Sequence, residues 1–168
     1  LHVQKNSNSN IEHYEFLADA TKDIDPRVSF IETLIQVIGT TGSIITYNES
    51  FEKGRLREIK SSFYQYSTEI DNMLNRVVDL MSPFRSHHYY TYDMKGSYSI
   101  KKVLPALVPH LSYEGMDIAD GGAASLSFMN LFNETNPLII NKTRKDLLKY
   151  CELDTLAMVE ILKHLLEV

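Results

Sequence analysis

The segment Ser43 to Tyr47 constrains the fold most, because it is a short, apolar, β-branched run between two stretches with helical spacing. Its length and composition indicate a strand buried inside a sheet. The runs Leu1 to Lys5 and Ile11 to Ala18 are typical of an antiparallel strand pair around the polar turn Asn6 to Asn10. Strands followed by alternating strands and helices predict an α/β (α+β) fold, a mixed β-sheet flanked by helices.

Helical spacing predicts most of the remaining elements. One helix opens at Asp25-Pro26, an N-cap followed by a first-turn proline, and ends at Gly39. A second helix begins near Ser50, and a third spans roughly Thr68 to Leu80. Beyond these we expect a short strand at His88 to Tyr92 and helices at Ser99 to Leu107, from Gly121-Gly122 to about Phe132, and from about Thr143 to the end.

Length and composition predict one ordinary globular domain over residues 1–168. The chain is 43% hydrophobic and 23% charged, and it contains one cysteine, Cys151. A single cysteine excludes an internal disulfide and suits a reducing, cytoplasmic setting. No signal peptide or membrane span is readable, so no membrane partner is expected. Because the first residue is Leu1 rather than Met, we expect a fragment of a longer polypeptide with further domains.

The net charge of −5 argues against a general polyanion-binding surface, because non-specific nucleic-acid affinity comes largely from Lys and Arg. It does not argue against a nuclease. Enzymes that hold phosphates through divalent metals need a cluster of carboxylates, which itself lowers the net charge.

Two carboxylates, on different predicted helices, each lie on the apolar face of their helix. Glu52 shares its face with Leu56 and Ile59, although its place in the first turn also suits the helix dipole. Asp154 lies in the middle of the last helix, on the same face as Tyr150 and Ile161. An unpaired buried carboxylate costs several kcal/mol, so Asp154 should have a strong partner such as a metal, an arginine or a backbone donor.

These residues carry a resemblance to a known family. The stretch Tyr150 to Asp154 (YCELD) matches the Tyr-x-x-x-Asp third motif of DnaQ-like (DEDDy) 3′–5′ exonucleases, which have a ribonuclease-H-like fold. The stretch Tyr47 to Glu52 (YNESFE) resembles their second motif, although that family usually places Asp where Glu52 stands.

A closer resemblance covers nearly the whole chain. It is to a bacterial family of domains of unknown function, number 2779, which is expected to be DnaQ-like and usually has Glu at this position. The matching stretches are Tyr47 to Leu56, Lys95 to Pro109, Ser112-Tyr113, Asp120 to Gly122 and Tyr150 to Val159.

The resemblance implies a metal-dependent exonuclease that acts on single-stranded ends of DNA or RNA. Glu52 and Asp154 would bind metal in a two-metal site for Mg²⁺ or Mn²⁺, and Tyr150 would orient the attacking water. The first motif, Asp-x-Glu on the first central strand, is not found before Tyr47 and is expected upstream of Leu1. These residues alone are therefore predicted to bind metal weakly and to be inactive or weakly active.

Candidate substrate-binding residues follow from the same stretches: Asn48, Lys95, Ser97 and Lys101. The lysines, with Lys102, could contact the nucleic-acid backbone, but a solvated helix start explains them about as well.

Other candidates have simpler explanations. Asp79 is better explained as a hydrogen-bonded strand or helix end than as a catalytic group. His87-His88 would make a poor chelate, because adjacent strand residues face opposite sides. Gly121-Gly122 marks a turn or a close helix approach.

The alternative to an enzyme is a non-catalytic ribonuclease-H-like module that docks nucleic acid or protein, or a purely structural domain of a larger protein.

Overall fold

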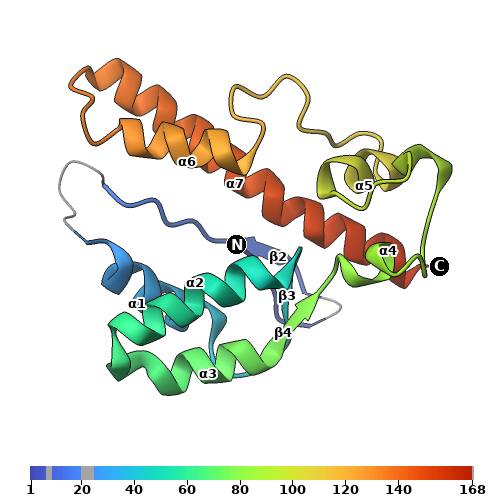
Figure 1. The fold of residues 1–168 in the computed structure, drawn as a ribbon, viewed down its shortest axis with the longest axis horizontal. Helices are drawn as coiled ribbons and strands as arrows, with labels where there is room; N and C mark the ends of the chain where they lie inside the picture. The colour runs from blue at the N-terminus through green and yellow to red at the C-terminus, as the bar shows by residue number, and fades with distance from the viewer. Residues whose placement is uncertain (7–8, 20–24, 168) are drawn as a thin grey trace. The chain divides into compact units, whose positions relative to one another are not determined.

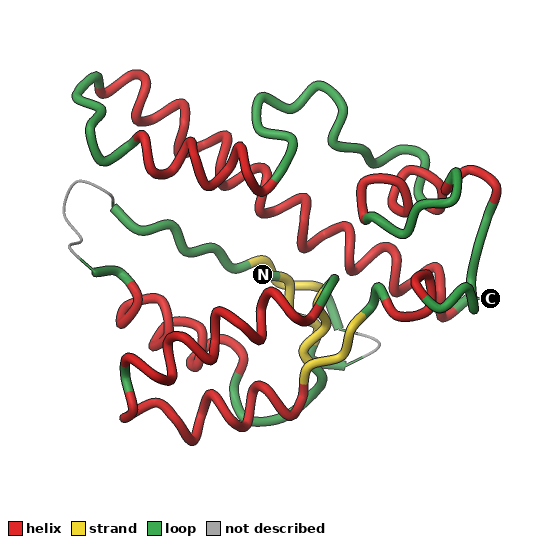
Figure 2. Tube along the Cα trace, in the orientation of Figure 1, coloured by secondary structure: helices red, strands yellow, loops and turns green. Residues whose placement is uncertain are grey.

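The computed structural model describes residues 1–6, 9–19 and 25–167. Most of the described backbone with regular structure is helical, and the strands are short (Figure 2). The chain divides into two compact units, each built from two separate stretches. The first unit comprises Leu1–Pro26 and Tyr113–Leu156, and the second comprises Arg27–Ser112 and Ala157–Val168. That the whole chain forms one domain stays a prediction.

The sheet of the first unit is an antiparallel pair of strands. Strand β1 (His2–Gln4) pairs with β2 (Ile11–His13), and His2 lies opposite His13 in the register. Just outside the pair, Leu1 and Tyr14 exchange backbone N–H···O bonds of 2.9 and 2.8 Å. The predicted antiparallel pair is therefore confirmed, whereas the predicted turn at residues 6–10 lies partly outside the described residues.

One helix, and the part of a longer helix up to Leu156, complete the first unit. Helix α6 (Gly121–Asn130) begins after Asp120, whose Oδ1 accepts a 2.8 Å hydrogen bond from the Ala123 amide. Helix α7 (Pro137–Leu166) begins ahead of the predicted start at Thr143. The reason is local, because Asn136 Oδ1 accepts from the Leu138 amide at 3.0 Å and a proline fits the first helical turn.

The core of the second unit lies among three helices. Helices α1 (Arg27–Ile38), α2 (Glu49–Ser62) and α3 (Ser67–Arg76) contribute to it, and the short 3₁₀ turn η1 (Tyr64–Tyr66) joins the last two. The predicted helices beginning at Asp25-Pro26 and near Ser50 are confirmed (Figure 1). The buried residues of this core are Ile31, Leu56, Ile59, Ile70 and Met73.

The second unit also contains a parallel strand pair. Strand β3 (Ile44–Thr46) pairs in register with β4 (Val77–Asp79), so the strand predicted at Ser43 to Tyr47 is confirmed. The predicted helix from Thr68 to Leu80 was wrong at its end, because α3 stops at Arg76 and β4 follows. The physical reason is the β-branched pair Val77-Val78, which favours a strand that can pair with another β-branched strand.

The chain after β4 forms short helical turns. These are α4 (Ser82–Arg85), η2 (Tyr92–Met94) and α5 (Ile100–Leu107), the last as predicted. The strand predicted at His88 to Tyr92 was wrong: the amides of His88 and Tyr89 both donate to the Pro83 carbonyl, at 2.9 and 3.2 Å. A backbone that turns back on α4 in this way cannot extend into a strand.

The fold class is therefore α+β, as predicted. Among the described residues the strands form two separate two-stranded sheets, one antiparallel and one parallel. No helix in the described part of the chain is long and apolar enough to cross a membrane.

Candidate functional site

Asp154 in the first unit is held by a tyrosine hydroxyl. It lies in the middle of α7, and its Oδ1 accepts a 2.7 Å hydrogen bond from the hydroxyl of Tyr113. Tyr113 is buried, and its ring lies 6.1 Å from the ring of Tyr150, measured between centroids. The partner expected for Asp154 is thus present, but it is an aromatic hydroxyl rather than an arginine or a backbone donor.

Tyr150 lies one helical turn before Asp154 on α7 and is buried. Burial raises the pKa of its hydroxyl well above the ordinary 10.0, and the charge and hydrogen bonding of Asp154 raise it further. The hydroxyl therefore keeps its proton at neutral pH. It can donate a hydrogen bond to a water or a phosphate, but it cannot act as a base there.

The start of helix α6 lies near the same tyrosine. A Cβ atom added at Gly121 would lie 4.0 Å from the Tyr150 hydroxyl, which is ordinary van der Waals contact. A Cβ at Gly122 would lie 3.1 Å from Oδ1 of Asp120, the atom that caps the helix. Gly122 thus keeps the capping carboxylate of Asp120 uncrowded, and Gly121 lies near the Tyr150 hydroxyl.

In the second unit, Asp79 organises the loop that leads into α2. It is the last residue of β4, and its buried side chain accepts from the backbone amides of Asn48 (2.9 Å) and Met81 (3.0 Å). Its Oδ2 lies 3.5 Å from Nη2 of Arg85. The interpretation of Asp79 as a hydrogen-bonded strand end is confirmed.

Asn48, predicted to bind substrate, occupies a special backbone position. It precedes α2 with φ 71° and ψ 70°, a left-handed conformation that Asn tolerates better than most residues. Its side-chain Oδ1 accepts a 2.8 Å hydrogen bond from the Ser50 hydroxyl. The exposed Asn48 side chain is thus fixed at the start of the helix that carries Glu52.

Glu52 lies in the first turn of α2 and is half-buried. Leu56 and Ile59, on the predicted face of the same helix, are buried in the core. The face assignment is therefore confirmed. The place of Glu52 in the first turn also agrees with the simpler explanation that the carboxylate interacts with the helix dipole, which favours a negative charge there.

The loop with Lys95 and Ser97 is tied to the end of β3. The hydroxyl of the half-buried Tyr47 donates a 2.7 Å hydrogen bond to the carbonyl of Tyr98, and partial burial together with the Asp79 charge raises the pKa of that hydroxyl. Lys95 is exposed with φ 52°, and Ser97 Oγ accepts from the Ser99 amide at 3.2 Å. One contact thus connects the second-motif segment to the predicted substrate-binding loop.

The predicted site residues therefore fall into two sets. The second unit contains Asn48, Glu52, Lys95, Ser97 and Lys101, and the first unit contains Tyr150 and Asp154. Lys101 is exposed in the first turn of α5. One residue that positions Asp154 was not anticipated from the sequence: Tyr113, which lies in a matched stretch and donates a hydrogen bond to that carboxylate.

The donor types fit the expected ions. Asp154 and Glu52 both offer carboxylate oxygens, the hard ligands that Mg²⁺ and Mn²⁺ prefer. Asp154 is anchored by Tyr113 through Oδ1, so its carboxylate is oriented before any ion binds.

Comparison with known proteins gives distant, longer relatives. Uncharacterized protein UU173 of Ureaplasma parvum is 28% identical over 160 residues, which cover 82% of this chain and 23% of that protein. Uncharacterized protein MG366 of Mycoplasma genitalium is 29% identical over 146 residues, covering 78% of this chain and 21% of that protein. Its homolog in Mycoplasma pneumoniae is 27% identical over 153 residues, with 84% and 23% covered.

The chain thus spans less than a quarter of the length of these relatives. No solved structure matches it. A family model does match, over residues 1–99, which include Glu52 but not Tyr150 or Asp154. Because that match covers more than half of the 168 residues, the chain belongs to the family described as Domain of unknown function (DUF2779).

Proposed function

We propose that the chain is part of a metal-dependent 3′–5′ exonuclease of the DnaQ-like, ribonuclease-H-like class. It would hydrolyse phosphodiester bonds at single-stranded ends of DNA or RNA. The observation that carries the proposal is Asp154, a helix-borne carboxylate beside two tyrosine hydroxyls, one of them Tyr150 a turn earlier. A second supporting observation, in the second unit, is that Asp79 holds the Asn48 amide at the start of the helix that carries Glu52.

In this proposal Glu52 and Asp154 hold the divalent cations. When bound, Mg²⁺ or Mn²⁺ would lower the pKa of an attacking water and neutralise charge on the leaving oxygen. Complete sites of this exonuclease class contain further carboxylates, so these two residues alone would bind metal weakly.

The remaining roles belong to groups that position the substrate. Tyr150 donates a hydrogen bond that orients the attacking water, since its raised pKa keeps the proton in place. Asn48, Lys95, Ser97 and Lys101 contact the phosphates and sugars near the end of the strand. The oxygens of Asp154 keep one orientation because Tyr113 donates to one of them.

The proposal extends to the setting of the domain. The relatives are much longer than the matched segment, so further domains of one polypeptide are the first expected partners. A single cysteine, exposed and without a disulfide, suits a cytoplasmic setting.

The test is degradation of an end-labelled single-stranded oligonucleotide with Mn²⁺, by the chain and by a polypeptide of the relatives' length. Asp154→Ala and Glu52→Ala should each reduce turnover by on the order of 100-fold or more, the scale of losing one charge-stabilising group. Asp93→Ala removes an exposed carboxylate from η2 and serves as the control with unchanged activity. Full activity in both site variants would refute the assignment.

One observation favours a second candidate, a non-catalytic docking module. The hydrogen bond from Tyr113 satisfies Asp154 inside the protein, so the carboxylate is stable there without metal. Calorimetric titration with Mn²⁺ separates the two candidates on the longer polypeptide. No heat of binding from a stably folded protein would support the module.

A further inference from the structure

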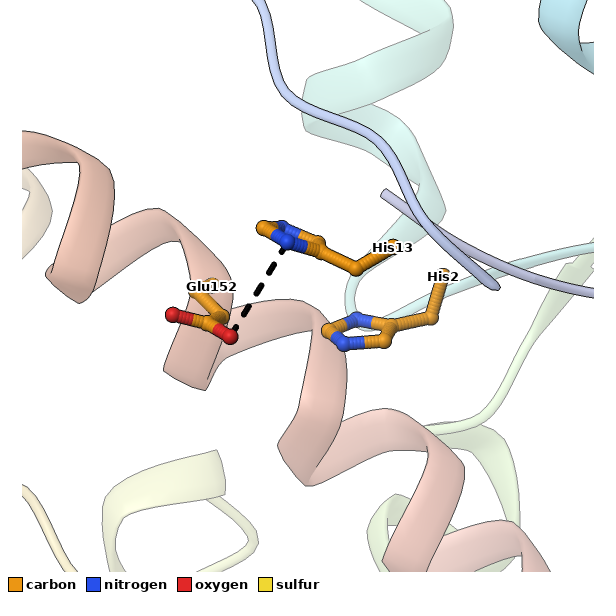
Figure 3. A group of neighbouring side chains, drawn as sticks. All are labelled: His2, His13 and Glu152. Carbon is orange, nitrogen blue, oxygen red and sulfur yellow. Dashed lines mark ion pairs between the residues drawn. The ribbon is translucent and has the colours of Figure 1, made fainter. Parts of the chain in front are cut away.

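Two histidines face each other across the antiparallel pair in the first unit. His2 and His13 are directly opposite in the register, and their rings are stacked with centroids 4.8 Å apart (Figure 3). The adjacent pair, Leu1 and Tyr14, exchanges both backbone hydrogen bonds. His2 and His13 therefore form the non-hydrogen-bonded pair, the position at which opposite side chains lie closest.

Helix α7 adds a carboxylate to this pair. Glu152 points toward the histidines, with Oε1 3.9 Å from Nδ1 of His13 (Figure 3). One ligand atom from each of His2, His13 and Glu152 lies within 4.8 Å of the others. In a tetrahedral site with bonds of about 2.0–2.1 Å, ligand atoms are separated by about 3.4 Å, so small side-chain rotations would close the remaining distance.

A neighbouring hydroxyl sets the tautomer of His2. Thr155 Oγ1 lies 2.8 Å from Nδ1 of His2, and the same hydroxyl donates to the backbone carbonyls of Cys151 and Glu152 at 3.3 and 3.2 Å. With its proton directed to the helix, Thr155 accepts from Nδ1–H of His2. The Nε2 lone pair then remains for a metal, the second-shell arrangement common in histidine sites.

We propose that His2, His13 and Glu152 form a binding site for one divalent transition-metal ion of the Zn²⁺ type. Two imidazoles and one carboxylate are a zinc donor set, with a fourth position left for water or another ligand, whereas Mg²⁺ prefers oxygen ligands. The bound ion would fasten the strand pair to α7 within the first unit. The proposed site uses none of the residues assigned to the nuclease centre and does not depend on the proposed nuclease activity.

The experiment is calorimetric titration of the folded chain with Zn²⁺, followed by visible spectroscopy with Co²⁺. The α-amino group is acetylated, because a free amine beside His2 would offer an additional nitrogen ligand. We expect one equivalent of Zn²⁺ to bind, and His13→Asn and Glu152→Gln each to weaken the affinity at least ten-fold. Both positions are exposed, so circular dichroism should show that the variants fold.

Two controls make the result specific. His110→Asn removes an exposed histidine from the second unit and should bind Zn²⁺ like the unchanged chain. Asp154→Asn should also retain Zn²⁺ binding, which separates this site from the proposed nuclease centre. The proposal is overturned if the folded chain binds no Zn²⁺, or if the affinity survives in both His13→Asn and Glu152→Gln.

Discussion

A carboxylate on the inner face of a helix is stable only with a partner, and Tyr113 is that partner for Asp154. The hydrogen bond joins residues 41 positions apart in the sequence. Periodicity placed Asp154 on the apolar face of its helix, but it could not identify a partner that only the folded chain brings near. The same limit applies to Asp79, whose partner amide at Asn48 lies on a preceding segment.

Tyr113→Phe tests this pairing directly. The change removes one hydroxyl and leaves the buried ring in place, so the loss reports the hydrogen bond to Asp154. We expect the free energy of unfolding to fall by about 1.5–2 kcal/mol, the lower part of the range for bonds to charged groups, because the pair is only partly buried. Urea denaturation monitored by circular dichroism measures it.

Tyr64→Phe is the matched control for that measurement. Tyr64 is 84% exposed, so loss of its hydroxyl should change the free energy of unfolding by less than about 0.5 kcal/mol. Equal stability of the two variants would show that the Tyr113 hydroxyl does not support Asp154.

In the second unit, an arginine at the end of α3 connects this helix to the turn between α1 and β3. Arg76 Nη1 donates to the carbonyls of Thr41 and Gly42 at 2.6 and 2.9 Å, and Nη2 donates to that of Gly39 at 2.7 Å. The guanidinium thus holds the turn between α1 and β3. The planar fork of arginine satisfies three carbonyls that water would otherwise have to solvate.

Arg76→Lys keeps the charge but removes this fork. We expect a loss of about 2 kcal/mol in the free energy of unfolding, because an ammonium group cannot reach the three carbonyls of the turn together. Arg57→Lys, at an exposed position on α2, should be close to neutral. Thermal and urea unfolding compare the stabilities of the two variants. An unchanged free energy of unfolding for Arg76→Lys would show that the guanidinium does not hold the turn between α1 and β3.

Element types could be predicted where periodicity and capping agree, as in the helix that begins after Asp25-Pro26. The prediction failed where a helix passes directly into a strand, because α3 and β4 meet at Arg76 and Val77 with no Gly or Pro between them. The aromatic stretch at His88 to Tyr92 has strand composition. Its backbone amides at His88 and Tyr89 instead donate hydrogen bonds to the carbonyl of Pro83, a local pairing that composition does not reveal.

At the scale of the molecule, the predicted site residues are shared between two compact units, each built from two stretches of chain. Motif spacing could identify Tyr150 with Asp154, because both lie on one helix. It could not reveal the pairing of His2 with His13, since neither residue stood out by spacing and their approach depends on strand register.

Charge provides the last test, because the chain carries a net charge of −5 while three lysines gather in one part of the second unit. Lys95, Lys101 and Lys102 are all exposed. Each lysine that neutralises a phosphate of a single strand contributes about −0.7 to the slope of log K against log salt. We therefore expect weak oligonucleotide binding with a slope of about −2, measured by fluorescence anisotropy between low and moderate salt.

The double variant Lys101→Gln/Lys102→Gln should make that slope shallower by about 1.4, since two phosphate contacts are lost. Lys145→Gln/Lys149→Gln removes the same charge from exposed positions on α7 and is the matched control. If both double variants weaken binding equally, the oligonucleotide responds to the net charge of the chain and not to this cluster. A change confined to the first variant instead places the nucleic-acid backbone along the first turn of α5.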